Sequence, residues 1–147
     1  MGIIGMPGST GSNSRDGSPT DPVGDLDRAE EKYRRAIEAD PDNADALGDY
    51  ANFLADYRGD YDRAEEMHQR AVEADSDDSG SLGDYANFLA DDRGDLDRAE
   101  EVYRRAIEAD PGNSVNLGNY ASFLADDRGD LDRAEEMFER AIAVDPD

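Results

Sequence analysis

The chain contains no cysteine and only one histidine, His68, among its 147 residues. The lack of cysteine excludes a disulfide framework, a thiolate nucleophile and any metal site built on thiolates. His68 has no second histidine with which to share a metal, and no nucleophile partner for it is suggested. Phosphate-binding glycine loops, nucleophile elbows and zinc-ligand spacings are also absent from the sequence. We therefore expect no catalytic residue, no cofactor and no specific metal site.

Positive charge is also scarce in this chain. It has 15 Lys and Arg residues against 38 Asp and Glu residues, which gives a formal net charge of −23. A field of this sign repels phosphate backbones and anionic lipids, so we expect neither nucleic acid nor a membrane surface as a partner. The charge favours a polar or basic protein or peptide.

Long hydrophobic runs are missing as well. The longest apolar run near the start is Ile3-Ile4, which is far too short for a signal peptide or a transmembrane helix. The sequence does not fix the compartment. We expect the cytoplasm by default, and an extracellular location if the protein forms fibres.

What the chain does have is an internal repeat. A segment of 35 residues recurs almost letter for letter at 24–58, 59–93 and 94–128, and a half copy follows at 129–147. A unit this short cannot bury its own apolar face and must stack on its neighbours, which predicts a solenoid. Residues 1–22 are rich in Gly, Ser, Pro and Thr and have no periodicity, so they predict a flexible N-terminal tail.

One helix of each unit follows a Gly-Asp pair. Its apolar residues recur at spacings of three and four, which predicts a buried stripe on an amphipathic helix. In the first copy they are Leu26, Ala29, Tyr33, Ala36 and Ile37, with equivalents in 61–72, 96–107 and 131–142. His68 takes the place of Tyr33 in the second copy, so we expect it to be a core residue. The predicted N-caps are Asp25, Asp60, Asp95 and Asp130.

The other side of this helix carries glutamate followed four residues later by arginine, as in Glu30 and Arg34 or Glu100 and Arg104. Such pairs stabilise an exposed helix by about 0.2–0.5 kcal/mol each. We expect these pairs to form a solvated face.

The second helix of each unit carries the pattern Leu47, Tyr50, Ala51 and Leu54, which repeats at 82–89 and 117–124. Helix pairs of this length, joined by a glycine-containing turn, pack antiparallel, and each pair stacks on the next.

These residues resemble the tetratricopeptide-repeat family. The family's turn and following helix match Gly59, Asp60, Tyr61, Ala64, His68 and Ala71. The resemblance covers residues 24–147 and implies an all-α fold, a right-handed superhelical solenoid of antiparallel helix pairs. The period is 35 residues instead of the family's usual 34, which predicts one extra residue near the turn before Gly59.

The resemblance also implies a concave groove that grips an extended peptide or a helix. The matching positions are Asp45, Gly48, Asn52, Ala55 and Asp56, then Gly83, Asn87 and Asp91, then Val115, Gly118, Ser122 and Asp126. Aspartates would supply charge, asparagines would bind a peptide backbone, and glycines would let a partner approach closely. Family members that clamp a C-terminal carboxylate use Lys and Arg at such places, so that ligand is disfavoured. The implied function is a non-enzymatic protein-interaction scaffold with an acidic groove.

An alternative function is self-assembly into a fibre. The repeats begin and end on the helix that follows Gly-Asp, so each end is expected to expose an apolar face and to lack a polar cap. Stacking of subunits end to end would leave a gap one helix wide, which the tail residues Ile3, Ile4 and Met6 would fill in their own subunit or a neighbour's. A fragment of a longer array, or a designed consensus repeat protein, would show the same near-identical copies.

The tripeptide Arg-Gly-Asp, known for integrin recognition, occurs at residues 58–60, 93–95 and 128–130. The repeat itself needs glycine for the turn and aspartate to cap the next helix. We therefore expect the tripeptide to be a by-product of the fold.

Overall fold

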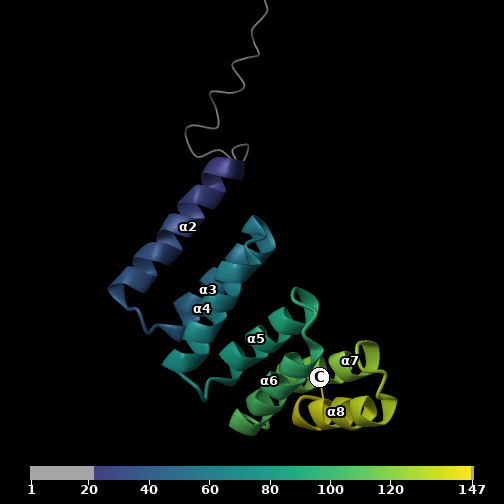
Figure 1. Ribbon diagram of the computed structural model, residues 1–147. Coiled ribbons are helices and arrows are strands. Elements are labelled where there is room, and N and C mark those ends of the chain that lie inside the picture. The colour runs from purple at the N-terminus through teal and green to yellow at the C-terminus, as the bar shows by residue number, and fades with distance from the viewer. Residues whose placement is uncertain (1–21, 147) are drawn as a thin grey trace, which may run out of the picture.

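The computed structural model describes residues 22–146, which form helices and short turns with no strand among them. The helices are α2 (Pro22–Ala39), α3 (Ala44–Phe53), α4 (Tyr61–Ala74), α5 (Ser79–Asp91), α6 (Leu96–Ala109), α7 (Ser114–Asp126) and α8 (Leu131–Val144). A π-helical segment, η2 (Leu54–Arg58), follows α3 directly. We call α3, α5 and α7 the A helices and the other four the B helices. Each A helix packs against the B helix that follows it, and the pairs succeed one another along the molecule (Figure 1). We call each such structural pair with its connecting turn (α3–α4, α5–α6 or α7–α8) a repeat, which is offset from the 35-residue sequence unit by one helix.

Aspartate side chains begin three of the B helices. Asp60, Asp95 and Asp130 are N-caps whose carboxylates accept hydrogen bonds from backbone N–H groups three residues later. The predicted caps are therefore confirmed at these positions. The prediction is wrong for Asp25, because α2 begins at Pro22 and Asp25 lies in its first turn. Proline suits the first position of a helix, so the helix takes in the last residue of the predicted tail.

The end of each A helix accommodates the extra residue of the 35-residue period as a widened turn. After α3 this turn is the π-helical segment η2, and Gly59 follows it in the left-handed conformation with φ 65°. After the other A helices the amide N–H of Arg93 donates to Phe88 O, and that of Arg128 to Phe123 O, each at 3.2 Å and across five residues. A π-type turn holds one more residue than an α-turn, so the extra residue lies where the sequence predicted it.

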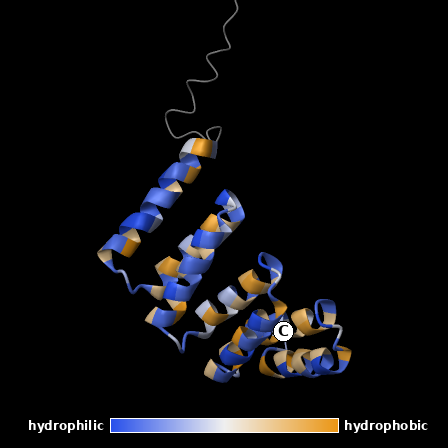
Figure 2. Cartoon of the chain, in the orientation of Figure 1, coloured by the Kyte–Doolittle hydropathy of each residue, from blue (hydrophilic) through white to orange (hydrophobic). Residues whose placement is uncertain are grey.

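The core is built from the same positions in every repeat. The fully buried leucines, each 0–1% exposed, are Leu47, Leu54, Leu82, Leu89, Leu117 and Leu124. Burial of each leucine side chain is worth about 1.5–3 kcal/mol relative to leaving it in water. Hydrophobic and hydrophilic residues alternate along the helices, as amphipathic packing requires (Figure 2).

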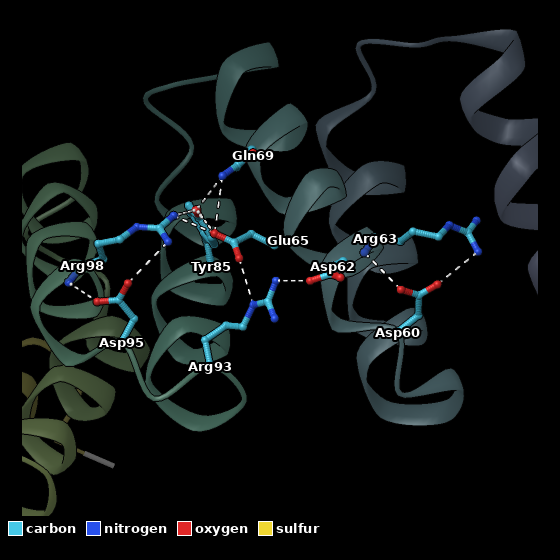
Figure 3. Close-up of polar contacts among 9 residues, drawn as sticks. All are labelled: Asp60, Asp62, Arg63, Glu65, Gln69, Tyr85, Arg93, Asp95 and Arg98. Atoms are coloured by element: carbon cyan, nitrogen blue, oxygen red, sulfur yellow. Dashed lines mark hydrogen bonds and ion pairs between the residues drawn. The ribbon is translucent and has the colours of Figure 1, made fainter.

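Glu65 of α4 joins its own repeat to the next one through a network of hydrogen bonds and ion pairs (Figure 3). Its carboxylate accepts a hydrogen bond from the Tyr85 hydroxyl at 3.2 Å and from Arg93 Nε at 2.9 Å. Arg98 donates to the same carboxylate at 2.7 Å. Arg93 also pairs with Asp62 at 2.7 Å. The carboxylate thus holds three side chains that come from the following repeat.

The same network recurs at the other two repeat boundaries. Its members there are Glu30 with Tyr50 and Arg58, and Glu100 with Tyr120 and Arg128. Burial raises the pKa of Glu30 and Glu100, but hydrogen bonds from tyrosine and arginine and the charges of arginines outweigh it, so each pKa lies below its ordinary value. Both residues are only 7% exposed. Their assignment to a solvated face was wrong, because the next repeat covers them.

His68 is a core residue, as its place in the repeat predicted. It is 1% exposed, and its ring lies 5.7 Å from that of Tyr85 and 5.0 Å from that of Phe88. Neither ring nitrogen has a hydrogen-bond partner in the described part of the chain. Burial lowers the pKa of His68 to about 4, and the charge of Glu65 opposes this effect.

The two end helices leave part of the predicted stripe exposed. Ala36 of α2 is exposed, whereas the equivalent Ala71 and Ala106 are 1% and 0% exposed. On α8, Phe138 is 41% exposed and Ile142 is 62% exposed. Within residues 22–146 no helix packs on these faces. The burial predicted for Ala36 is therefore wrong, because an A helix is needed on that side to cover it. Its exposure and that of Phe138 and Ile142 agree with the prediction that each end exposes an apolar face.

The Glu65 network can be tested with a matched pair of substitutions. We expect Glu65→Gln to lower the free energy of unfolding by about 2 kcal/mol, because Arg93 and Arg98 lose their shared carboxylate. The exposed neighbour Glu66 provides the control. We expect Glu66→Gln to change the free energy of unfolding by less than about 0.5 kcal/mol. Denaturant titration measures both, and equal effects would contradict the role given to Glu65.

His68 gives a prediction on pH dependence. The fold favours the neutral imidazole, so the unfolded chain takes up a proton first as the pH falls below 6.5, and stability is lost from there towards pH 4. This loss amounts to about 2 kcal/mol between pH 7.5 and pH 5. We expect His68→Tyr, which restores the residue type of Tyr33 and Tyr103, to remove that part of the pH dependence in urea titrations. If the free energy of unfolding of His68→Tyr falls by the same amount between pH 7.5 and pH 5 as that of the original chain, His68 is not the cause of the pH dependence.

Candidate functional site

The A helices form a surface with three adjoining cavities. One cavity of about 220 Å³ lies between α5 and α7, and two of about 190 and 120 Å³ lie between α3 and α5. Asn87 and Asp91 line both of the larger cavities, and Asp84 lines both of the cavities beside α3. The three cavities therefore adjoin one another, and we call the residues that line them the groove.

Most of the groove residues predicted from the sequence line these cavities. They are Asp45, Gly48, Asn52, Ala55, Asp56, Asn87, Asp91, Ser122 and Asp126. Gly83, Val115 and Gly118 do not line any of the three. Gly83 is buried and Val115 is 67% exposed to solvent. The predicted assembly residues Ile3, Ile4 and Met6 lie outside the described residues.

Sequence reasoning missed several groove residues. Asp84 bridges two of the cavities, and Asp49 and Asn119, which occupy the same repeat position, line one cavity each. Asp92 lies at the rim beyond α5, and Tyr103 reaches the groove from a B helix. Asp49, Asp84 and Asn119 share one repeat position, and this recurrence was the sequence signal that could have identified them.

The groove has a single sign of charge. Aspartates line all three cavities, and no Lys or Arg lines any of them. Partial desolvation in the groove raises the pKa of Asp84; a hydrogen bond from Asn52 opposes this effect, and the charges of Asp49 and Asp78 add to it. Partial desolvation and the charge of Asp127 raise the pKa of Asp91. These carboxylates therefore repel one another at neutral pH, and an incoming cation would relieve the repulsion.

A buried tyrosine supports one of the groove asparagines. The hydroxyl of Tyr103 donates a hydrogen bond to the side-chain oxygen of Asn87. Burial and the charges of Asp91 and Asp127 raise the pKa of Tyr103, so its hydroxyl keeps its proton. The side chain of Asn87 is thereby held in one orientation at the centre of the groove.

Two equivalent glycines have different surroundings in the groove region. A Cβ on Gly83 would lie 2.0 Å from Oδ1 of Asn116, whose amide donates to Ser79 O at 2.9 Å. A Cβ on Gly48 would meet nothing within 4 Å. The smaller Ser81 stands between α3 and α5 at the repeat position of Asn116. Asn116 therefore fills the site beside Gly83, and the site beside Gly48 remains open.

The Arg-Gly-Asp tripeptides are parts of the repeat boundaries. Arg93 donates to Glu65 and Asp62 of the preceding repeat, and Asp95 caps α6. Gly94 between them has a φ of 67°. The prediction that the tripeptide follows from the fold is confirmed, because each of its residues has a structural role.

The described part of the chain offers no group of three metal-ligating side chains. In residues 22–146 we also find no helix of the length and apolar character needed to cross a membrane.

Family models of the tetratricopeptide repeat match residues 23–82 and 92–147, and a second such model matches residues 54–114. The chain belongs to the tetratricopeptide-repeat family. Its all-α solenoid of antiparallel helix pairs is the right-handed superhelical fold that the resemblance implied.

Solved structures of MamA have a similar fold. A crystal structure of MamA matches with a TM-score of 0.65 and 25% identity, over 84% of this chain and 71% of that chain. MamA of MSR-1 matches with a TM-score of 0.64 and 22% identity over 84% and 70% of the two chains. A double mutant of MamA of RS-1 matches with a TM-score of 0.67 and 18% identity over 84% and 68%. No curated protein sequence matches the chain significantly. The repeats and the fold are those of a protein-interaction scaffold.

The paired glycines test the packing beside the groove. We expect Gly48→Ala to raise the free energy of unfolding by about 0.5–1 kcal/mol, because alanine favours the helix and enters open space. Gly83→Ala should lower it by about 1 kcal/mol, because it displaces the Asn116 side chain from its hydrogen bond. Urea titration measures both variants, and a stabilising Gly83→Ala would contradict the close packing of α5 and α7.

Proposed function

We propose that this protein is a non-enzymatic scaffold whose groove binds an extended, basic segment of a partner protein. The observation that carries the proposal is the charge of the groove: three adjoining cavities on the A helices are lined by aspartates and by no Lys or Arg. A chain with a formal net charge of −23 also attracts cationic partners over a long range, which speeds their encounter.

The raised pKa values of Asp84 and Asp91 support a cationic ligand. These carboxylates are partly desolvated and lie near other carboxylates, so their charged forms are disfavoured in the free protein. A lysine or arginine in the groove would supply the missing opposite charge. Part of the binding energy would thus come from repulsion that is already present in the free groove.

Regularly spaced asparagines support an extended ligand. Asn52 and Asn87 occupy the same position in successive repeats, and both line the cavity between α3 and α5. Asn119, at the repeat position of Asp84, adds a third carboxamide in the next cavity, where Ser122 takes the position of Asn52 and Asn87. A carboxamide both donates and accepts hydrogen bonds, so a row of them suits the alternating N–H and C=O groups of a peptide backbone.

The groove does not suit a ligand whose recognition depends on its own carboxylate. Such a ligand needs Lys or Arg in the groove, and the three cavities have none. Acidic peptides and free C-terminal carboxylates are therefore the negative controls for any binding experiment.

Fluorescence anisotropy with labelled 10-residue peptides tests the proposal. We expect a Lys- and Arg-containing peptide to bind and a Glu-rich peptide of the same length to fail. Asp84→Asn and Asp91→Asn should each weaken binding about three- to tenfold, because each removes one groove charge.

The control removes the same charge outside the groove. Glu108 on α6 is exposed and lines none of the three cavities, so Glu108→Gln should leave the affinity within about twofold of the original. If the groove and control variants weaken binding equally, the peptide responds only to the net charge and the groove is not its site.

Self-assembly is a second candidate function, favoured by the exposed Phe138 and Ile142 on α8. The connector predicted from the sequence, Ile3, Ile4 and Met6, lies outside the described residues. Assembly through these residues stays a prediction.

A further inference from the structure

The first and last described helices are nearly the same in sequence. Residues 24–31 and 129–136 both read GDLDRAEE, and Tyr33, Arg35, Ala36 and Ile37 of α2 correspond to Phe138, Arg140, Ala141 and Ile142 of α8. The two helices therefore carry matching side chains at these positions, and they differ where Lys32 and Arg34 of α2 correspond to Met137 and Glu139 of α8. Their surroundings in the structure differ.

The inner face of α2 is covered by α3. The ring of Tyr33 lies 5.8 Å from that of Tyr50 and 5.4 Å from that of Phe53. Glu30 accepts a hydrogen bond from the Tyr50 hydroxyl at 2.7 Å, and it also accepts one from Arg58 at 3.0 Å. Aromatic contacts and the carboxylate network together hold α2 on α3.

The equivalent face of α8 is exposed. Phe138 is 41% exposed, whereas Tyr103, at the same position of α6, is 3% exposed beneath α7. Leu131 and Ile142 are 68% and 62% exposed. Glu135 corresponds to Glu30, but it is exposed and, among the described residues, no tyrosine or arginine of a following repeat donates to it. The face is thus one half of a repeat boundary whose other half would be an A helix.

The outer face of α2 is adapted to solvent. Met67, Val102 and Met137 are 8%, 5% and 8% exposed at one position of the other B helices, and Met67 lines one cavity together with Ile37 of α2 and Tyr50 of α3, the helices that precede it. Lys32, the single lysine of the chain, takes that position in α2 and is exposed. An unpaired lysine is costly to bury, so this side of α2 does not suit another helix. Among the described residues, helix α2 therefore packs through one face only.

We propose that α8 of one copy docks on α3 of a second copy in the place of α2, so that copies join head to tail. In this arrangement Phe138 takes the position of Tyr33 against Tyr50 and Phe53, and Glu135 takes the position of Glu30. The partner for the exposed face of α8 is thus a second copy of this chain, and α2 is an internal competitor for the same surface. The contact is heterologous and repeats the B-to-A packing found within the chain, so it continues the superhelix and leads to open growth.

The competition sets the concentration at which copies join. Residues 40–43 tether α2 to α3, and a short tether gives an effective concentration of the order of 1 mM. Helix α8 shares the aromatic and glutamate contacts of α2, but it has Glu139 in place of Arg34, which pairs with Glu30. An α8 helix of another copy therefore competes with α2 only near or above that concentration. Any change that loosens α2 while leaving α8 intact will lower the concentration needed for growth.

Light scattering coupled to size-exclusion chromatography tests the proposal on the full chain from about 1 μM to 1 mM, a range chosen to reach the effective concentration of the tether. We expect Tyr33→Ala to lower the concentration of half-maximal growth at least tenfold. The double variant Tyr33→Ala with Phe138→Glu should remain monomeric, and Tyr33→Ala with Glu135→Ala should grow less. The control Lys32→Ala should behave as the unchanged chain.

A second route leaves every contact unchanged. Insertion of a Gly-Ser segment between residues 40 and 43 lowers the effective concentration of α2 at α3, and should promote growth even if Tyr33→Ala disturbs folding. The proposal is overturned if neither change promotes growth. It is also overturned if growth survives Phe138→Glu, or if association stops at a dimer that does not respond to Tyr33→Ala, since two α8 faces would then pair with each other.

Discussion

The contact between each B helix and the next A helix is the interaction on which the rest of this structure depends. A unit of 35 residues cannot bury its own apolar surface, so its B helix needs the following repeat. Glu65 shows how the contact is fixed, because its carboxylate holds Tyr85, Arg93 and Arg98 of the next repeat at once. A partly buried carboxylate with these partners accepts only a narrow range of geometries. Repetition of that geometry produces a regular superhelix.

The same contact separates the charges of the molecule. Arg58, Arg93 and Arg128 pair with glutamates at the repeat boundaries, where they neutralise carboxylates of the B helices. The A helices keep aspartates on their other surface with no basic residue beside them in the groove. A binding surface of one charge thus arises without extra elements, as a consequence of where the arginines are needed for stacking.

The sequence predicted the repeat, the fold and three of the four aspartate caps, because these depend on patterns within one unit. It also located His68 in the core and the extra residue before Gly59. It failed for Glu30 and Glu100, since spacing within a helix does not show that another repeat covers a side chain. It missed Asp84 for a similar reason, because the groove forms only when neighbouring A helices stand side by side. It placed the start of α2 too late, because Pro22 suits the first turn of a helix.

The groove as the binding surface is the central claim, and a nuclear magnetic resonance titration of the isotopically labelled full chain with a basic peptide tests it most directly. The account predicts that the shifted amides and side-chain carboxamides cluster on α3, α5 and α7, including those of Asn52, Asn87 and Ser122. It also predicts that the exposed surface of the B helices is unaffected. Shifts spread over α4, α6 and α8, with none in the groove, would contradict the account.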